Sequence, residues 1–240
     1  MSLILVAHGT RRPGGVEMIG GLAAQVSTLV GRTVQVAFVD VLGPTPSEVL
    51  SGADGPAIVV PAFLARGYHV RTDLPAHVAA SGHPDVTVTP ALGPSREIAR
   101  ITAQQLVKSG WRRGDSVILA AAGTSDQRAR ADLRTTAVLL SALTGSPVDL
   151  GFVATGERHL HSAVKTARRA KRRVAVASYL LADGLFQERV RASGADIVSR
   201  PLGTHPGLAR LIAGRFHGAM PPRREAMCAR RALSNSANHA

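Results

Sequence analysis

Short apolar runs alternate with longer amphipathic stretches along the chain. Strands are predicted at residues 3–7, 34–39, 57–60 and 86–88, and again at 116–121, 148–152, 174–177 and 196–198. Apolar residues at helical spacing predict helices at 15–30, 96–109, 128–143, 157–170 and 205–216. This alternation favours an α/β fold with two mostly parallel sheets flanked by helices, because right-handed crossovers place successive strands side by side.

The two series of strands form an internal repeat. His8-Gly9-Thr10 recurs as Ala122-Gly123-Thr124, and Leu92-Gly93 recurs as Leu202-Gly203. Residues 60–70 also match residues 176–186 if one residue of slippage is allowed. We therefore expect tandem domains at 1–113 and 114–219 with a cleft between them. The basic tail at 220–240 has no apolar stripe and is predicted to be disordered.

The composition fits this fold class and indicates in which cellular compartment the protein is expected. Hydrophobic residues make up 45% of the 240 positions but aromatics only 3%, so the core must rest on aliphatic side chains, as in parallel sheets. Cys228 is the one cysteine, which excludes an intramolecular disulfide and makes the cytoplasm the expected compartment. No apolar stretch approaches the roughly 18 residues of a membrane span, so we expect no membrane partner.

The formal charge of +13 predicts a positive field that attracts anions. Nucleic acid, anionic lipid and a small polyanion would all respond to such a field. The sequence lacks the aromatic platforms and recognition motifs that normally accompany nucleic-acid binding, so nucleic acid is disfavoured.

Three candidate ligands follow three predicted strands. His8 comes directly after the first strand, Asp40 after the second, and His69 lies in the connection that leaves the third. Ligands of open α/β sheets bind outside the carboxyl ends of the strands, so these side chains can converge. Two imidazoles and a carboxylate suit Fe²⁺, Co²⁺, Ni²⁺ or Zn²⁺. Each residue alone also fits a structural role, as a histidine bonded to backbone or an aspartate in a turn.

The second half of the repeat lacks these imidazoles. Ala122 answers to His8, and about Phe186 answers to His69. Any catalysis is therefore expected within residues 1 to about 110, with the second half forming the opposite wall of the cleft. The remaining histidines fall on predicted helices or loops without this convergence, where surface or capping roles are expected: His77, His83, His159, His161, His205 and His217.

The two histidine motifs carry a family resemblance. The opening stretch at 3–11, the stretch at 60–75 containing Gly67-Tyr68-His69-Val70, and the Leu92-Gly93 turn resemble the sirohydrochlorin and cobalt chelatase family in its long, two-half form. The resemblance covers residues 1 to about 217. It implies an enzyme in which His8 and His69 handle the metal and accept protons from the ring. The resemblance also implies Asp40 as a third metal contact. Family members commonly carry a Glu at this position.

The resemblance also implies an anionic substrate that the positive charge would attract. Its implied substrate, sirohydrochlorin, is a tetrapyrrole bearing eight carboxylates, and Arg11, Arg12, Arg66 and Arg71 flank the two histidines. Guanidinium groups suit carboxylates, so these four arginines are predicted to bind the substrate. The divalent metal, Fe²⁺ or Co²⁺, is itself a substrate, and no organic cofactor is required.

Two other functions remain open at this point. A two-lobed carrier could bind the tetrapyrrole or metal without converting either. His8 could also be the nucleophile of a phosphoryl-transfer enzyme, although the Arg-His-Gly expected of a histidine phosphatase is replaced by Ala7-His8-Gly9. We expect a monomer or a weak homodimer, because a duplicated chain can achieve internally what a shorter relative achieves by pairing.

Overall fold

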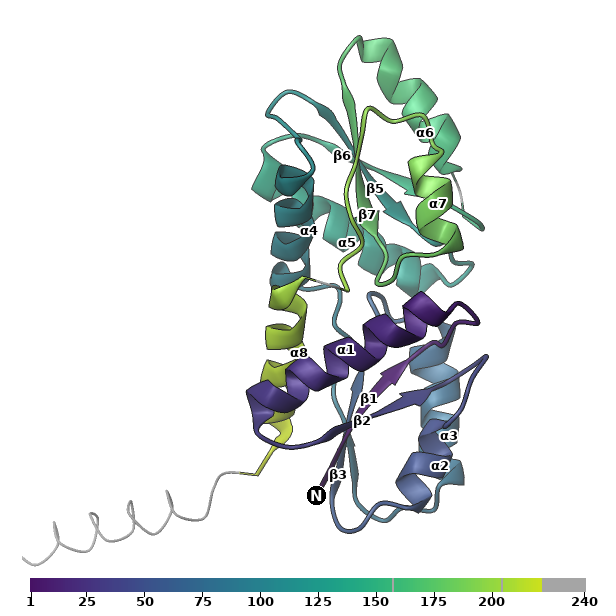
Figure 1. Cartoon of the computed structure of the whole chain (residues 1–240). Helices are drawn as coiled ribbons and strands as arrows, with labels where there is room; N and C mark the ends of the chain where they lie inside the picture. Colours follow the sequence, from purple (N-terminus) through teal and green to yellow (C-terminus); the bar gives the residue numbers. More distant parts are fainter. Residues whose placement is uncertain (157, 204, 222–240) are drawn as a thin grey trace, which may run out of the picture.

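Two α/β lobes stack end to end in the computed structural model, which describes residues 1–156, 158–203 and 205–221 (Figure 1). The predicted disorder of the tail falls almost entirely on residues outside the described part of the chain. Each lobe contains one four-stranded, fully parallel sheet. The predicted α/β class with two parallel sheets is confirmed.

The sheets have the same strand order. In the N-terminal lobe β1 (Ser2–Ala7), β2 (Val34–Phe38), β3 (Ala57–Pro61) and β4 (Val86–Val88) lie in the order β2-β1-β3-β4. In the C-terminal lobe β5 (Ser116–Ala121), β6 (Val148–Phe152), β7 (Val174–Tyr179) and β8 (Ile197–Val198) lie in the order β6-β5-β7-β8. In both sheets the chain runs from the central first strand to the strand on one side of it and then crosses to the strand on the other side. A topological switch point therefore lies between β1 and β3, and between β5 and β7.

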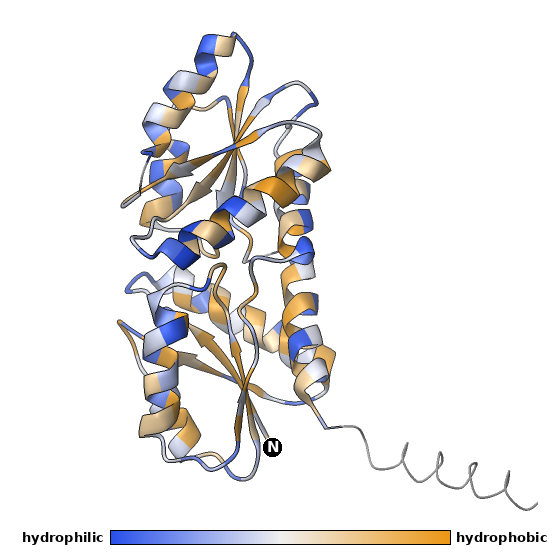
Figure 2. Ribbon diagram, turned by 180° about the vertical axis from the view of Figure 1, so that it is seen from behind, coloured by the Kyte–Doolittle hydropathy of each residue, from blue (hydrophilic) through white to orange (hydrophobic). Residues whose placement is uncertain are grey.

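Helices cover both faces of each sheet. The N-terminal sheet is flanked by α1 (Pro13–Val30), α2 (Pro46–Ser51) and α3 (Leu74–Ala80). The C-terminal sheet is flanked by α5 (Gln127–Thr144), α6 (Leu160–Ala167), the 3₁₀ turn η2 (Arg168–Ala170) and α7 (Leu185–Arg191). Figure 2 shows apolar strands at the centre of each lobe and helices whose polar residues face outward. This is the pattern expected when a sheet is buried on both faces.

The last helix of each half packs on the other half. α4 (Arg96–Lys108) ends the first series of elements but packs against α5 and β7, whereas α8 (Pro206–Ala219) ends the second and packs against α1 and β3. In Figure 1 α4 stands beside the upper lobe and α8 beside the lower one. The expected ranges 1–113 and 114–219 thus each contain a whole sheet, but they exchange a helix.

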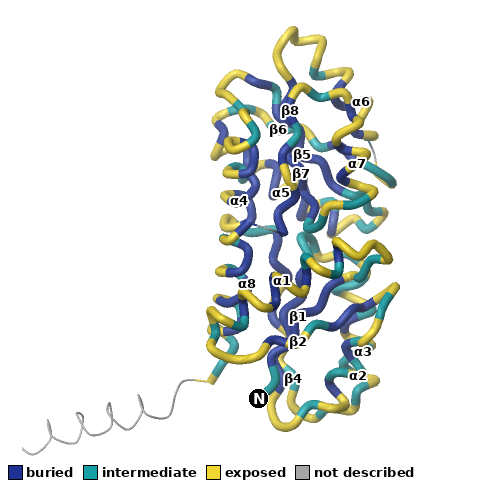
Figure 3. The backbone as a smooth tube through the Cα atoms, viewed as in Figure 1, coloured by how far each residue is buried: buried dark blue, intermediate teal, exposed yellow. Residues whose placement is uncertain are grey.

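One apolar core joins the lobes because of this exchange. Its buried side chains include Leu5 and Ile98 from the first half and Leu119 and Phe216 from the second. Figure 3 shows buried backbone running through both sheets, with exposed backbone at the outer loops. No helix in the described ranges combines the length and apolar character that a membrane crossing requires.

Candidate functional site at the switch point between β1 and β3

His8 is held by backbone bonds at the end of β1. The Asp40 amide donates to the His8 carbonyl at 3.1 Å, which ties the residue to the chain leaving β2. Gly9 then turns the chain with φ of 95°, and a Cβ there would lie 2.2 Å from the Asp40 carbonyl oxygen. Only glycine fits so close an approach with a positive φ. The imidazole of His8 is consequently presented at the sheet edge, where it is exposed to solvent.

His69 opens a single π-helical turn, η1 (His69–Asp73), in the connection from β3 to α3. Such turns are rare and occur frequently at functional sites. The His69 ring centroid lies 4.4 Å from that of His8, and the two planes meet edge to face at 86°. Phe63 stacks on His69 at 6.2 Å, and its ring supports one face of the imidazole. The structure therefore brings together the two histidines predicted from sequence.

Asp73 orients His69, and this residue was missed in the sequence. The Nδ1 atom of His69 lies 2.5 Å from Oδ2 of Asp73, one turn further along η1. A carboxylate accepts hydrogen bonds, so Nδ1 carries the proton and the lone pair of Nε2 is left for a metal or a proton. The i, i+4 spacing of the two residues was the available signal. The sequence predicts no helix over this stretch, and the spacing has meaning only within a helical turn.

Asp40 is not brought to the histidines. Its Oδ1 accepts a 2.7 Å bond from the amide of Val41, whose φ of 71° is unusual for a β-branched residue. The carboxylate thus stabilises the turn after β2 and is not among the residues lining the cavity beside His8. In the described ranges, no three His, Cys, Asp or Glu side chains are grouped so that they could hold a metal ion. His8 and His69 are therefore the two groups at this edge of the sheet that could hold a metal ion.

A cavity of about 580 Å³ lies next to the histidines and between the lobes. This volume falls in the range of about 300–1,000 Å³ that small-molecule sites occupy. His8, Phe63 and His69 line it from the first half, and Thr124 and Phe186 line it from the second. Among the described residues that line it, none carries a carboxylate or a guanidinium group. The cavity suits an apolar ring whose charged substituents remain at the mouth.

Three of the four predicted substrate arginines bridge the lobes. Arg12 pairs with Glu188 at 2.5 Å, Arg66 with Asp132 at 2.6 Å, and Arg71 with Asp126 at 3.1 Å. The Asp132 side chain is only 2% exposed, and it accepts bonds from the amide, Nε and Nη2 of Arg66. These hydrogen bonds raise the pKa of Arg66. These three arginines therefore link the two lobes.

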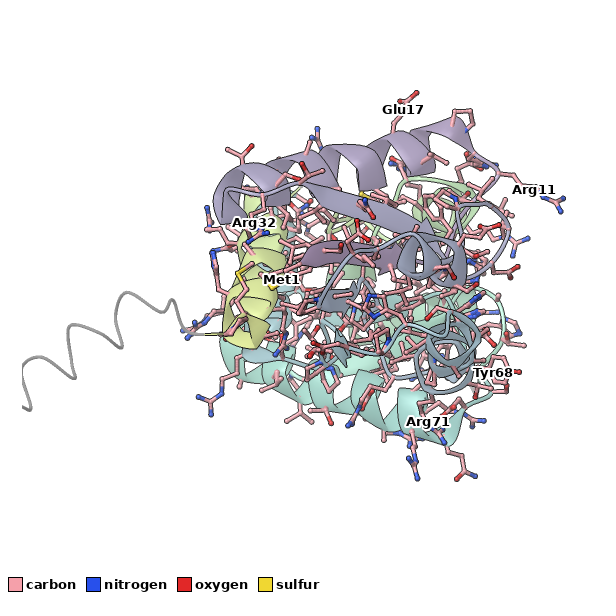
Figure 4. The ribbon with its side chains drawn as sticks, turned by 90° about the horizontal axis from the view of Figure 1, so that it is seen from below. Met1, Arg11, Glu17, Arg32, Tyr68 and Arg71 are labelled. Atoms are coloured by element: carbon pink, nitrogen blue, oxygen red, sulfur yellow. The ribbon has the colours of Figure 1, made fainter. Side chains whose placement is uncertain are left out.

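Arg11 differs from the other three. It is exposed and forms no ion pair within the described part of the chain. Figure 4 shows its side chain extending into solvent at the right-hand edge of the view, where Tyr68 also lies. Tyr68 lines the cavity and is 62% exposed, so this side is its mouth. Arg11 is placed where it could meet a charged ligand before the ligand enters.

Fold and site together define a class of protein. The class has two parallel α/β lobes and paired imidazoles at a switch point, which face an interlobe cavity open to solvent. Within the class, the sequence model of the CbiX family matches residues 2–109 and again residues 116–219. The chain belongs to the CbiX family, with one copy of the family unit in each half, and the family resemblance of the two motifs is confirmed.

Individual relatives agree with the family match. The chain is 35% identical over 81 residues to the sirohydrochlorin cobaltochelatase of Methanopyrus kandleri, covering 31% of this chain and 56% of that protein. It is also 35% identical over 92 residues to the sirohydrochlorin cobaltochelatase of Methanothermobacter thermautotrophicus, covering 35% and 64%. The chain thus matches less than two thirds of the length of either relative.

Solved structures share the fold over nearly the whole chain. SirB from Bacillus subtilis, solved with Fe³⁺, superposes with a TM-score of 0.77 at 19% identity, covering 90% of this chain and 94% of that one. CbiX of denitrifying bacteria, described as the terminal enzyme of sirohaem biosynthesis, superposes with a TM-score of 0.70 at 21% identity, covering 92% and 100%. The two-lobed arrangement is therefore shared with both.

Proposed function

We propose that this protein inserts a divalent metal, Fe²⁺ or Co²⁺, into sirohydrochlorin. The observation that carries the proposal is the pair of imidazoles, 4.4 Å apart, at one wall of a cavity whose other described lining residues are apolar or uncharged polar. The family membership and the names of its chelatase relatives give the substrate class. The metal is a substrate here, so two protein ligands and open positions suit its transfer onward.

Insertion exchanges two pyrrole N–H protons for one M²⁺ ion. In this proposal His8 holds the ion first, because its imidazole is exposed at the cavity, and the lone pair freed when the ion passes to the ring then accepts one proton. His69 accepts the second proton or completes delivery through Nε2, which Asp73 leaves with its lone pair. Both protons then pass to solvent at the open mouth. No organic cofactor takes part in the exchange.

Substrate carboxylates are proposed to remain at the mouth. Arg11 makes the first contact, because it has no ion-pair partner in the described residues, and Arg12 can exchange half-exposed Glu188 for a ring carboxylate. Arg66 and Arg71 keep their ion pairs with acidic residues of the second lobe. They therefore fix the two walls of the cleft relative to each other and do not bind the substrate. Both carboxylate contacts lie near the surface, so higher ionic strength should weaken substrate binding.

The test is anaerobic spectrophotometry of sirohydrochlorin with Fe²⁺ or Co²⁺, with and without protein. Wild-type protein should form the metallated ring faster than the blank, and His8→Ala and His69→Ala should each lose the acceleration. His161→Ala is the matched control, because His161 is exposed on α6 of the other lobe. The faster metal identifies the pathway. Tight binding of the ring without acceleration would instead establish a carrier.

A further inference from the structure

The C-terminal half repeats the backbone of the site closely enough to align it residue by residue. A Cβ on Gly93 would lie 2.3 Å from the carbonyl oxygen of Leu64, and a Cβ on Gly203 would lie 2.3 Å from that of Leu181. Leu64 and Leu181 are therefore equivalent. Five residues further along the chain, His69 is equivalent to Phe186, which removes the one-residue uncertainty of the sequence repeat.

The first motif aligns by the same kind of contact. Gly9 and Gly123 both have positive φ, 95° and 126°. A Cβ on either would lie 2.2 Å from a carbonyl oxygen of the chain that follows the neighbouring strand, at Asp40 and Thr155. His8 is thus equivalent to Ala122. The second half has kept the backbone of a metal site and has lost both imidazoles.

The lost site faces the same cavity as the histidines. Ala122 and Phe186 line it from the C-terminal lobe, whereas His8 and His69 line it from the N-terminal lobe. Phe186 is 40% exposed, while Phe38, Phe152 and Phe216 are at most 6% exposed. An exposed phenyl ring at a cavity is a surface that a ligand can cover.

We propose that the former metal site of the C-terminal half is a docking wall for the flat face of the tetrapyrrole. This inference rests on the proposed chelatase function and assigns the two walls different tasks. Phe186 contacts one face of the ring, and Ala122 leaves room for that contact. His8 and His69 address the other face, so the metal enters from the N-terminal lobe only.

The charge distribution fits this division. The described residues that line the cavity carry no carboxylate, ammonium or guanidinium group, so an aromatic ring loses little by leaving water there. Glu188 follows Phe186 by two residues on α7 and holds Arg12 across the mouth. A ring carboxylate that takes Arg12 from Glu188 would bring the macrocycle beside Phe186.

The experiment measures binding apart from turnover. Metal-free sirohydrochlorin is titrated into wild type, Phe186→Ala, Phe186→Tyr and the control Val138→Ala, using the absorbance of the ring. Val138 is 67% exposed on α5 and is not among the cavity residues, so its loss tests the effect of removing an exposed apolar side chain. The Kd and KM for sirohydrochlorin should rise roughly tenfold in Phe186→Ala. They should stay near wild type in Phe186→Tyr and in the control.

Two further measurements, kcat and Co²⁺ binding, separate this inference from the function on which it rests. The kcat of Phe186→Ala at saturating ring and its Co²⁺ binding should match wild type, because the histidines are untouched. Wild-type turnover together with unchanged Kd in Phe186→Ala would overturn the docking wall and leave the chelatase proposal standing. Failure of folded wild-type protein to bind or metallate the ring would overturn both.

Discussion

At the residue scale, the orientation of His69 is the feature most open to test. We expect Asp73→Asn to lower kcat for metal insertion about 10- to 100-fold, as loss of a group that orients a metal-binding histidine commonly does. An amide can donate to Nδ1, and that would move the ring proton to Nε2 and remove the lone pair from the cavity side. Nitrogen NMR of His69 would report the change of tautomer directly.

The control for this substitution is Asp54→Asn, an exposed aspartate in the connection before β3. It should leave kcat and the His69 spectrum unchanged. Wild-type kcat in Asp73→Asn would show that the short contact between Asp73 and His69 has no part in insertion.

The convergence of His8 and His69 could be predicted from the sequence because the backbone dictates their positions. His8 and His69 follow strands that are neighbours in a parallel sheet, and the structure places their rings in contact. Asp40 also follows a strand, but its carboxylate accepts a hydrogen bond from the adjacent Val41 amide. The arginines were harder to place because their partners come from the other half of the chain, which a local pattern does not reveal.

At the element scale, the histidine that caps the N-terminus of α8 makes stability depend on pH. His205 is buried, and its Nδ1 accepts a 3.0 Å bond from the Gly207 amide. Burial lowers the pKa of His205, and the charges of Lys108 and Arg210 lower it further. The unfolded chain then binds a proton more readily than the folded one. This contribution is complete above the unfolded value of about 6.5 and is lost as pH falls through the folded pKa.

The measurement is urea unfolding at pH 7.5 and pH 5. Wild type should lose more free energy of unfolding on acidification than His205→Asn, which keeps an N-cap acceptor but does not titrate. His217→Asn replaces an exposed histidine near the end of the same helix and should behave as wild type. Equal losses in all three proteins would remove His205 as a source of the pH dependence.

The strands and the long helices were predicted well, and the short helices were not. All eight strands of the structure lie within two residues of the predicted runs, because buried parallel strands appear as unbroken apolar stretches. The helices α2, α3 and α7 have six or seven residues and were not predicted. Two turns are too few to establish a period against a background of loop residues.

At the scale of the whole molecule, Arg66 and Asp132 form an ion pair between the lobes, and replacing one partner should cost more free energy of unfolding than replacing the other. Arg66→Ala leaves the carboxylate of Asp132 buried without its guanidinium partner and should cost about 2–3 kcal/mol of unfolding free energy. Asp132→Asn keeps an acceptor for the Arg66 amide and frees a half-exposed guanidinium, so it should cost only about 1 kcal/mol. Urea unfolding of the two variants would give the order, and the reverse order would contradict this account.

The exchange of α4 and α8 leads to the last prediction. In residues 1–113 alone, α4 would lack α5 and β7, and the faces of α1 and β3 that α8 covers would be exposed. The internal repeat makes α4 the equivalent of α8, so two fragments can each lend α4 to the other. We therefore expect fragment 1–113 to be a folded dimer by size exclusion with light scattering. A folded monomer would show that α4 can cover its own sheet, and the lobes would then be independent domains.

That dimer would also change the chemistry of the cavity. Each copy would present His8 and His69, so four imidazoles would face one another where the full chain opposes two imidazoles to Ala122 and Phe186. Metal binding should then double per cavity, while the ring would lose its apolar wall. If Phe186 docks the macrocycle, the fragment dimer should bind Co²⁺ at least as tightly as the full chain and sirohydrochlorin more weakly. Duplication followed by loss of one histidine pair would in that case have replaced a second metal site with a better site for the ring.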